Sequence, residues 1–206
     1  MGNPPFIGAM WSKGSQREDI AYVFPECSKP GEIDYVAGWY AKAIKYIQGT
    51  KIQCAFVSTN SISQGQQVAL MWEPLMKQYG MKFNFAYRTF RWDSEANLKA
   101  HVHCVIIGFS LDESKQKFIF DGENKFEAKQ INGYLDDAPN VFITATKKQV
   151  SNMPLMHMGS MARDGGFLMM DQDEYDQYIK EEPQGQMFIH QYMMGREFIN
   201  NTRWRN

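Results

Sequence analysis

Apolar residues recur at helical spacing in two segments of the chain. The first covers residues 34–48 and stops at Gly49. The second covers residues 66–79 and stops at Gly80. Pro74 lies inside the second segment, and because it has no amide donor it should kink or restart that helix. The apolar positions are Tyr35, Val36, Trp39, Tyr40, Ala43, Ile44 and Ile47 in the first segment, and Val68, Met71, Trp72, Leu75, Met76 and Tyr79 in the second.

Three other segments have the pattern of β-strands. Residues 52–59 are mostly apolar, as expected for a buried parallel strand. Residues 82–89 alternate with a period of two, and residues 101–109 are continuously apolar. The order helix, strand, helix, strand, strand predicts an α/β fold, the second half of a doubly wound sheet that ends in an antiparallel hairpin.

The pattern changes after Ser110. Short strands are expected at residues 117–120 and 141–144, and charged turn residues separate them. Asp171 followed by Glu174 predicts a capping box that opens a helix. Pro183 should open a second helix that Gly195 ends. We therefore expect a first domain at 1–110, a linker at 111–135 and a mixed α+β region at 136–206.

Composition narrows the possible partners and compartments. The 206 residues contain 22 Lys+Arg and 23 Asp+Glu, so no basic excess indicates nucleic acid, and any such function must come from a site. The longest apolar stretches are strand-sized and no secretory signal is visible, which predicts a cytoplasmic protein without a membrane partner. The three cysteines are widely spaced, and His101 and His103 lack a third ligand in register, so neither a disulfide nor a metal site is expected.

The strongest candidate for chemistry is the run Asn3-Pro4-Pro5-Phe6. Two prolines fix the backbone and remove two donors, which leaves Asn3 Oδ1 and the Pro4 carbonyl as acceptors in set directions. Such a pair suits the two hydrogens of a planar NH₂ group, and Phe6 could stack on the ring that carries it, a contact worth about 1–3 kcal/mol for a nucleobase. The alternative is a rigid turn with no chemistry.

The run matches the Asn/Asp/Ser-Pro-Pro-aromatic motif of S-adenosylmethionine-dependent amino-methyltransferases. Nearly the whole chain also resembles the MmeI-like bifunctional restriction-modification enzymes and related adenine-specific DNA methyltransferases. The segments that carry this resemblance are DYVAGWYAKAIKYI, CAFVSTNSISQG, FAYRTFRW, HVHCVIIGFS and DAPNVFI. The resemblance implies the carboxy-terminal half of a Rossmann-like class I methyltransferase sheet, followed by the start of a target-recognition region.

The resemblance also implies roles for particular residues. Asn3 and Pro4 would hold the N6 amine of a flipped adenine in double-stranded DNA, Pro5 would keep the turn rigid, and Phe6 would stack on the base while S-adenosylmethionine donates the methyl group. Ser58 and Asn60, after the strand at 52–59, are expected to line the same pocket, or else to form a polar turn that caps the next helix. Phe90 and Trp92 fall in the expected loop between the last two strands. There the family has an aromatic that packs on the target base, although a cluster that plugs the core fits Trp92 equally well.

The family's glycine-rich cofactor turn lies ahead of its catalytic motif, and only Met1 and Gly2 precede Asn3. The expectation is therefore a fragment whose main cofactor site is absent and whose activity belongs to a longer protein. The isolated chain is expected to be inactive and to bind S-adenosylmethionine weakly, so micromolar one-to-one binding in a calorimetric titration would contradict this view.

Rival functions remain at this point. A protein-glutamine methyltransferase is one, because a glutamine side chain also carries a planar NH₂; the long region after Phe109 favours DNA. An inactive DNA-binding or assembly module is another. Asp121 with Glu127 and Lys129 imitates a nuclease signature, but the spacing is short and the segment is a charged linker, so we reject it.

Overall fold

The chain divides into two units, Met1–Lys147 and Lys148–Asn206. The computed structural model describes residues 1–93, 101–113, 116–146, 151–152, 154, 165–201 and 204–205. The first unit holds a five-stranded mixed sheet and the helices that cover it, and the second is a small α+β unit. Each unit is described by itself.

The sheet of the first unit has the strand order β1-β3-β2-β4-β5. Its last two sequential hairpins are antiparallel, β2 with β3 and β4 with β5, whereas β2 and β4 run parallel. The expected antiparallel hairpin of β2 and β3 is thus confirmed. The strands are β1 (Cys54–Thr59), β2 (Lys82–Asp93), β3 (His101–Ser110), β4 (Lys117–Asp121) and β5 (Asn124–Ala128).

β1 differs from the expected parallel strand, because β3 inserts beside it and pairs antiparallel along its whole length. Among the residues that the structure describes, the parallel neighbour of β1 is a single bridge between Gly2 and Phe56. The Gly2 amide donates to the Ala55 carbonyl at 2.9 Å, and the Val57 amide donates to the Gly2 carbonyl at 3.1 Å. The residue just ahead of Asn3 is therefore hydrogen-bonded to β1.

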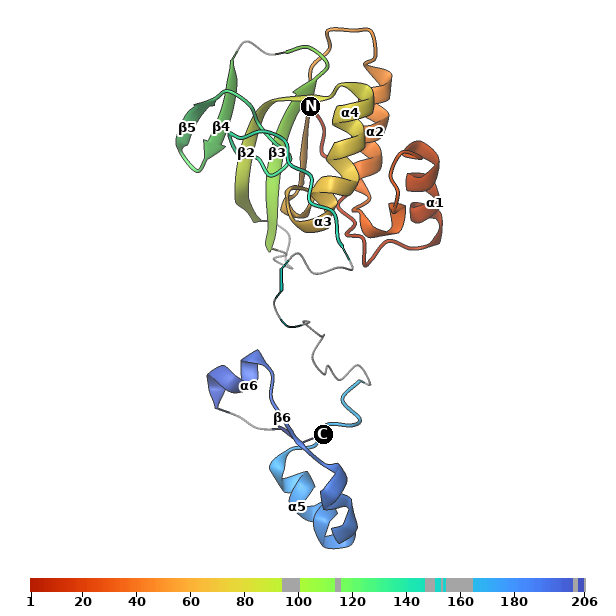
Figure 1. Ribbon diagram of the computed structural model, residues 1–206, viewed down its shortest axis with the longest axis vertical. Helices are drawn as coiled ribbons and strands as arrows, with labels where there is room; N and C mark the ends of the chain where they lie inside the picture. The colour runs from red at the N-terminus through yellow and green to blue at the C-terminus, as the bar shows by residue number, and fades with distance from the viewer. Residues whose placement is uncertain are drawn as a thin grey trace. The chain divides into compact units, whose positions relative to one another are not determined.

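Helices α2 (Val36–Tyr46) and α4 (Glu73–Tyr79) cover one face of this sheet, and α1 (Gly14–Val23) packs beside α2 (Figure 1). The second expected helix is present but divided into α3 (Gly65–Gln67), the π-helix η3 (Val68–Trp72) and α4. Pro74 stands in the first turn of α4, where its missing amide costs least, so the expected restart is confirmed. Short 3-10 turns η1 (Pro30–Glu32) and η2 (Asn60–Ser63) complete the layer.

Aromatic side chains fill the space between this helical layer and the sheet. Tyr40 of α2 contacts Trp72 edge-on, with ring centroids 5.1 Å apart. Trp72 in turn contacts Phe83 of β2 at 4.8 Å. Tyr40, Trp72 and Phe83 are 0–2% exposed, and edge-to-face pairs stabilise such a core beyond the area they bury. The core therefore fixes α2 and the helix after β1 against the sheet.

Three expectations for the rest of the first unit were wrong. β2 continues to Asp93, because its register with β3 resumes after a bulge and extends the strand through Trp92. Residues 111–135, expected to be a linker, contain β4 and β5, which hydrogen-bond into the same sheet. Residues 141–144 form no strand, and Val141 and Ile143 are 60% and 65% exposed.

The second unit begins with the expected capping box. Asp171 Oδ1 accepts from the Glu174 amide at 2.9 Å, and Glu174 Oε2 accepts from the Asp171 amide at 2.8 Å, which opens α5 (Gln172–Glu181). The second expected helix is only the 3-10 turn η4 (Pro183–Phe188), and Gly195 begins a helix rather than ending one. The chain leaves the helical path because β6 (Gln191–Tyr192) pairs with β7 (Trp204–Arg205), and α6 (Gly195–Asn200) lies between them.

In the described ranges no helix has the length and apolar character needed to cross a lipid bilayer.

Candidate functional site: the Asn3–Phe6 motif and its supports

The motif Asn3-Pro4-Pro5-Phe6 leaves the sheet directly after the bridge between Gly2 and β1. Because Gly2 runs parallel to β1, the motif and the loop after Thr59 leave the sheet toward the same edge. Asn3 and Pro5 are exposed, Phe6 is partly buried and Pro4 is buried. Hydrogen bonds of Gly2 thus hold the start of the motif, and Pro4 is buried within it, whereas Asn3 is open to solvent.

The two predicted acceptors have no partner in the described part of the chain. No hydrogen bond there reaches Asn3 Oδ1 or the Pro4 carbonyl, and the two prolines have no amide donors of their own. Asn3 Oδ1 and the Pro4 carbonyl are thus available to a donor from outside.

The loop after the motif is tied to the start of α2. The Ile7 carbonyl accepts from the Tyr35 amide at 2.9 Å. The Ala9 amide donates to Asp34 Oδ1 at 2.8 Å. Asp34 is 4% exposed and also receives hydroxyls from the loop after β1, with Thr59 Oγ1 at 3.3 Å and Ser61 Oγ closer. Asp34 therefore connects the loop after the motif to the loop after β1.

Ser58 and Asn60 occupy different environments. Ser58 is fully buried and its hydroxyl lies 3.0 Å from the Tyr40 hydroxyl, in the core. Burial raises the pKa of Tyr40, against the hydrogen bond with Ser58 that lowers it. Asn60 is only partly buried, and among the described contacts its side chain forms no hydrogen bond. The interior position of Ser58 does not fit the expected contact with a base, whereas Asn60 remains a candidate.

Phe90 and Trp92 stand in β2 rather than in a loop. Phe90 pairs with Cys104 and Trp92 with Val102 across the β2–β3 register. Their rings lie 6.3 Å apart on one side of the strand, and Trp92 is 43% exposed. No contact in the described ranges joins them to Phe6 or Asn3, so their role toward a base stays a prediction. The exposure of Trp92 disfavours the alternative in which it plugs the core.

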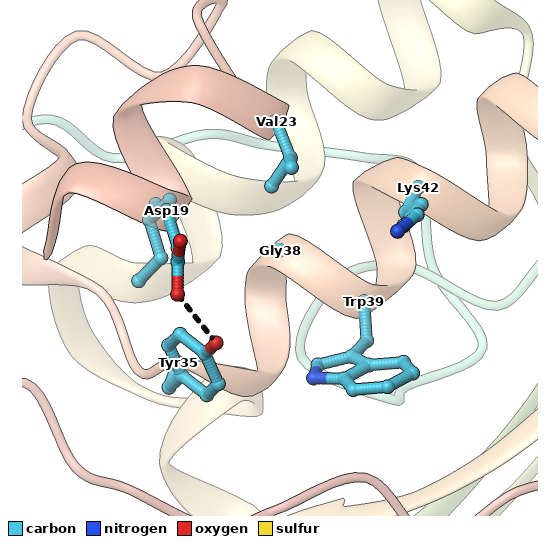
Figure 2. A pocket seen from close by; sticks show the side chains of 7 residues that line it. Asp19, Val23, Tyr35, Gly38, Trp39 and Lys42 are labelled. Atoms are coloured by element: carbon cyan, nitrogen blue, oxygen red, sulfur yellow. Dashed lines mark hydrogen bonds between the residues drawn. The ribbon is translucent and has the colours of Figure 1, made fainter. Parts of the chain in front are cut away.

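A pocket between α1 and α2 lies apart from the motif (Figure 2). Its wall includes Asp19, Tyr35, Trp39 and Lys42, and the Tyr35 hydroxyl donates to Asp19 Oδ2 at 2.9 Å. No residue of the motif lines it. Its link to the candidate site is the backbone of Tyr35, which holds the Ile7 carbonyl, so we assign it a structural role.

The supports of the motif were not recognised in the sequence. Asp34 immediately precedes the helical pattern and therefore resembles an ordinary helix cap, while Ser61 and Gln67 fall in a polar stretch. An aspartate ahead of an apolar run is a common signal, and only the fold brings it to the motif loop. Within the described ranges, no group of three metal-ligating side chains gathers at this or any other place.

The fold and the motif together define a methyltransferase-type α/β domain. The family of the MmeI DNA-methyltransferase domain matches residues 1–121, and the family of the MmeI target recognition domain matches residues 137–205. The chain belongs to the MmeI family, with a DNA-methyltransferase domain followed by a target recognition domain.

Two known proteins are similar to the chain over almost all of its length. DNA methyltransferase A of Bacillus subtilis (strain 168) is 35% identical over 200 residues, which is 97% of this chain and 23% of that protein. A solved structure of the Type IIL restriction-modification enzyme MmeI in complex with DNA matches with a TM-score of 0.92 and 43% identity, over 98% of this chain and 28% of that one. The chain thus spans about a quarter of the length of these relatives.

Proposed function

We propose that the protein that carries this chain transfers a methyl group from S-adenosylmethionine to the N6 amine of adenine in a specific double-stranded DNA sequence. The observation that carries the proposal is the pair of unoccupied acceptors, Asn3 Oδ1 and the Pro4 carbonyl, next to the partly buried ring of Phe6. Two family matches on one chain, a DNA-methyltransferase domain and a target recognition domain, favour DNA over a glutamine side chain as the substrate.

The chain's own residues act on the amine. In the proposed complex the N6 amine donates one hydrogen to Asn3 Oδ1 and one to the Pro4 carbonyl, which frees its lone pair to point out of the ring plane. Phe6 stacks on the extruded base and offsets part of the cost of unstacking it. After transfer N6 carries one proton too many, and this proton passes to water because neither acceptor is a base at neutral pH.

The methyl donor would supply an electrophilic methyl group on a sulfonium. The residues fit such a donor in one respect: Asn3 is exposed, so a second ligand can approach it. Asn60 is proposed to line the same pocket from the loop after β1, and Phe90 and Trp92 to contact the base or its neighbours from β2.

The replacement of Asn3 by Ala tests the mechanism. It removes an acceptor that works best when the lone pair turns toward the methyl group, so kcat should fall about 100-fold or more while the affinities for DNA and donor change little. Single-turnover kinetics with labelled donor and a filter-binding titration with DNA measure the two effects. Equal rates for the wild type and the Asn3→Ala variant would remove Asn3 from the mechanism.

A further inference from the structure

Asp34 is a buried carboxylate with a donor on every side. Oδ1 accepts from the Ala9 amide at 2.8 Å and from Gln67 Nε2 at 3.1 Å. Oδ2 accepts from Thr59 Oγ1 at 3.3 Å and from Ser61 Oγ. With 4% exposure, this side chain meets water almost nowhere, so the protein has replaced its hydration shell with four fixed donors.

The four donors come from three separate segments. Ala9 lies three residues after Phe6, Thr59 and Ser61 flank Asn60, and Gln67 ends α3. Gln67 binds Asp34 twice, since its Oε1 also accepts from the Asp34 amide at 3.0 Å. The neighbouring Tyr35 amide holds the Ile7 carbonyl at 2.9 Å. One position therefore ties the chain just after the motif to the loop just after β1.

These bonds are not those of a helix cap. Tyr35 is the N-cap of α2, and none of the four donors to the Asp34 carboxylate belongs to that helix. Burial of a charged group costs several kcal/mol unless every lone pair is matched. The matched donors belong to the chain after the motif, to the segment around Asn60 and to α3, so a small shift of Asp34 would move the motif relative to Asn60. Misplacement of reacting groups by about 1 Å can lower a rate about 100-fold.

We propose that Asp34 is a positioning residue for methyl transfer. It sets the path of the chain after Phe6 against the loop of Asn60, and it thereby keeps Asn3 Oδ1 and the Pro4 carbonyl aimed at the amine. The proposal rests on the proposed function of Asn3–Phe6. Position rather than charge is what Asp34 supplies, because all its partners are neutral groups.

The neutral partners lead to a specific pair of variants. In Asp34→Asn, the amide oxygen can keep the Ala9 amide and Gln67, while the new NH₂ donates to the Thr59 and Ser61 hydroxyls, which accept as well as they donate. In Asp34→Ala the link between the two loops is lost. We expect kcat about 100-fold lower for Asp34→Ala and within about 5-fold of wild type for Asp34→Asn, with the affinity for DNA within about 3-fold in both.

Glu26→Ala is the matched structural control. Glu26 accepts from Tyr79 and from Lys45 near the other end of α2, about 15 Å along the helix from Asp34. Its loss should lower the thermal midpoint while kcat stays at the wild-type value. If Asp34→Ala does not fold, Gln67→Ala replaces it: this partly exposed residue loses two bonds to Asp34, and kcat should fall about 10-fold with DNA affinity kept.

All variants are measured in one assay together with Asn3→Ala, in the protein that carries this chain. If Asp34→Ala keeps the wild-type kcat, the positioning role is overturned; the same holds for Gln67→Ala where that variant replaces it. A kcat of Asp34→Asn as low as that of Asp34→Ala would also overturn this role. If Asn3→Ala is slow and the Asp34 and Gln67 variants are not, only the positioning role fails. If Asn3→Ala is as fast as the wild type, the proposed function of the motif fails first.

Discussion

Ser58 and Asn60 are two residues apart in one polar run, yet their side chains lie in different environments. Ser58 closes a hydrogen bond with Tyr40 in the core, and Asn60 stands partly open at the end of β1. The difference arises because the chain turns into η2 directly after Thr59, which ends the alternation of the strand. Ser58 and Asn60 therefore need separate tests, although they lie in one polar run.

Ser58→Ala should affect stability and not catalysis. The substitution leaves the Tyr40 hydroxyl buried without a partner, which costs about 1–3 kcal/mol of the free energy of unfolding. In Ser58→Ala/Tyr40→Phe both partners are gone, so the double variant should be no less stable than Tyr40→Phe alone. Chemical denaturation measures these differences, and kcat should stay at the wild-type value in Ser58→Ala. A large fall in kcat with unchanged stability would return Ser58 to the substrate pocket.

At the scale of elements, α2 is held at both ends by polar contacts. Asp34 lies at its start, and Lys45 near its end donates to Glu26 Oε2 at 3.1 Å and to the Val23 carbonyl at 2.9 Å. Tyr79 of α4 donates to the same glutamate. The second cluster ties α2 to α4 and to the end of α1.

Stability should depend on pH through Glu26. Burial raises the pKa of Glu26, but hydrogen bonds from Tyr79 and Lys45 and the charge of Lys45 outweigh it, so the pKa lies below its usual 4.5. A carboxyl whose pKa is lowered in the folded state stabilises the fold above pH 4.5, and this contribution is lost as the pH falls through the folded-state pKa.

Glu26→Gln should therefore be less stable than the wild type at pH 7, by about 1 kcal/mol for a partly exposed pair. The difference should shrink as the pH falls below the folded-state pKa of Glu26. Urea titrations at several pH values measure it. A difference that persists unchanged into acid would show that the charge of Glu26 is irrelevant and that packing carries the effect.

The spacing of apolar residues and the positions of glycines and prolines predicted the main elements of the first unit. Helix α2, the restart at Pro74 and strands β1 to β3 follow from apolar spacing and from single glycines and prolines, which act locally. The sequence could not reveal features that depend on pairing between strands far apart along the chain. These are the extension of β2, the position of β3 beside β1, and the parallel pairing of β4 with β2. Val141 and Ile143 form no strand, because no strand in the described ranges pairs with them.

The candidate site shows the same division. Asn3 to Phe6 could be found because two adjacent prolines fix the local backbone, so their effect can be read from the sequence without knowledge of the fold. Asp34 could not, because an aspartate before an apolar run is usually a helix cap, and its four donors are brought together only by folding. The roles of Asn60, Phe90 and Trp92 toward a base remain predictions.

At the scale of the whole molecule, one chain joins a unit of methyltransferase type to a unit of target recognition type. The first unit contains the motif that we propose binds the amine, and the second matches a domain named for recognition. This pairing is what one expects of an enzyme that modifies a base only within a chosen sequence, and it is why DNA is the proposed substrate.

Nucleoside analysis by mass spectrometry tests that claim most directly. DNA is incubated with S-adenosylmethionine and either the wild type or the Asn3→Ala variant of the protein that carries this chain, then digested and resolved. We predict that N6-methyldeoxyadenosine is the sole new nucleoside with the wild type. With the variant, at least about 100-fold less of it should form at early times. Methylated cytosine, or equal yields of N6-methyldeoxyadenosine from both proteins, would contradict the assignment of Asn3, Pro4 and Phe6 to the adenine amine.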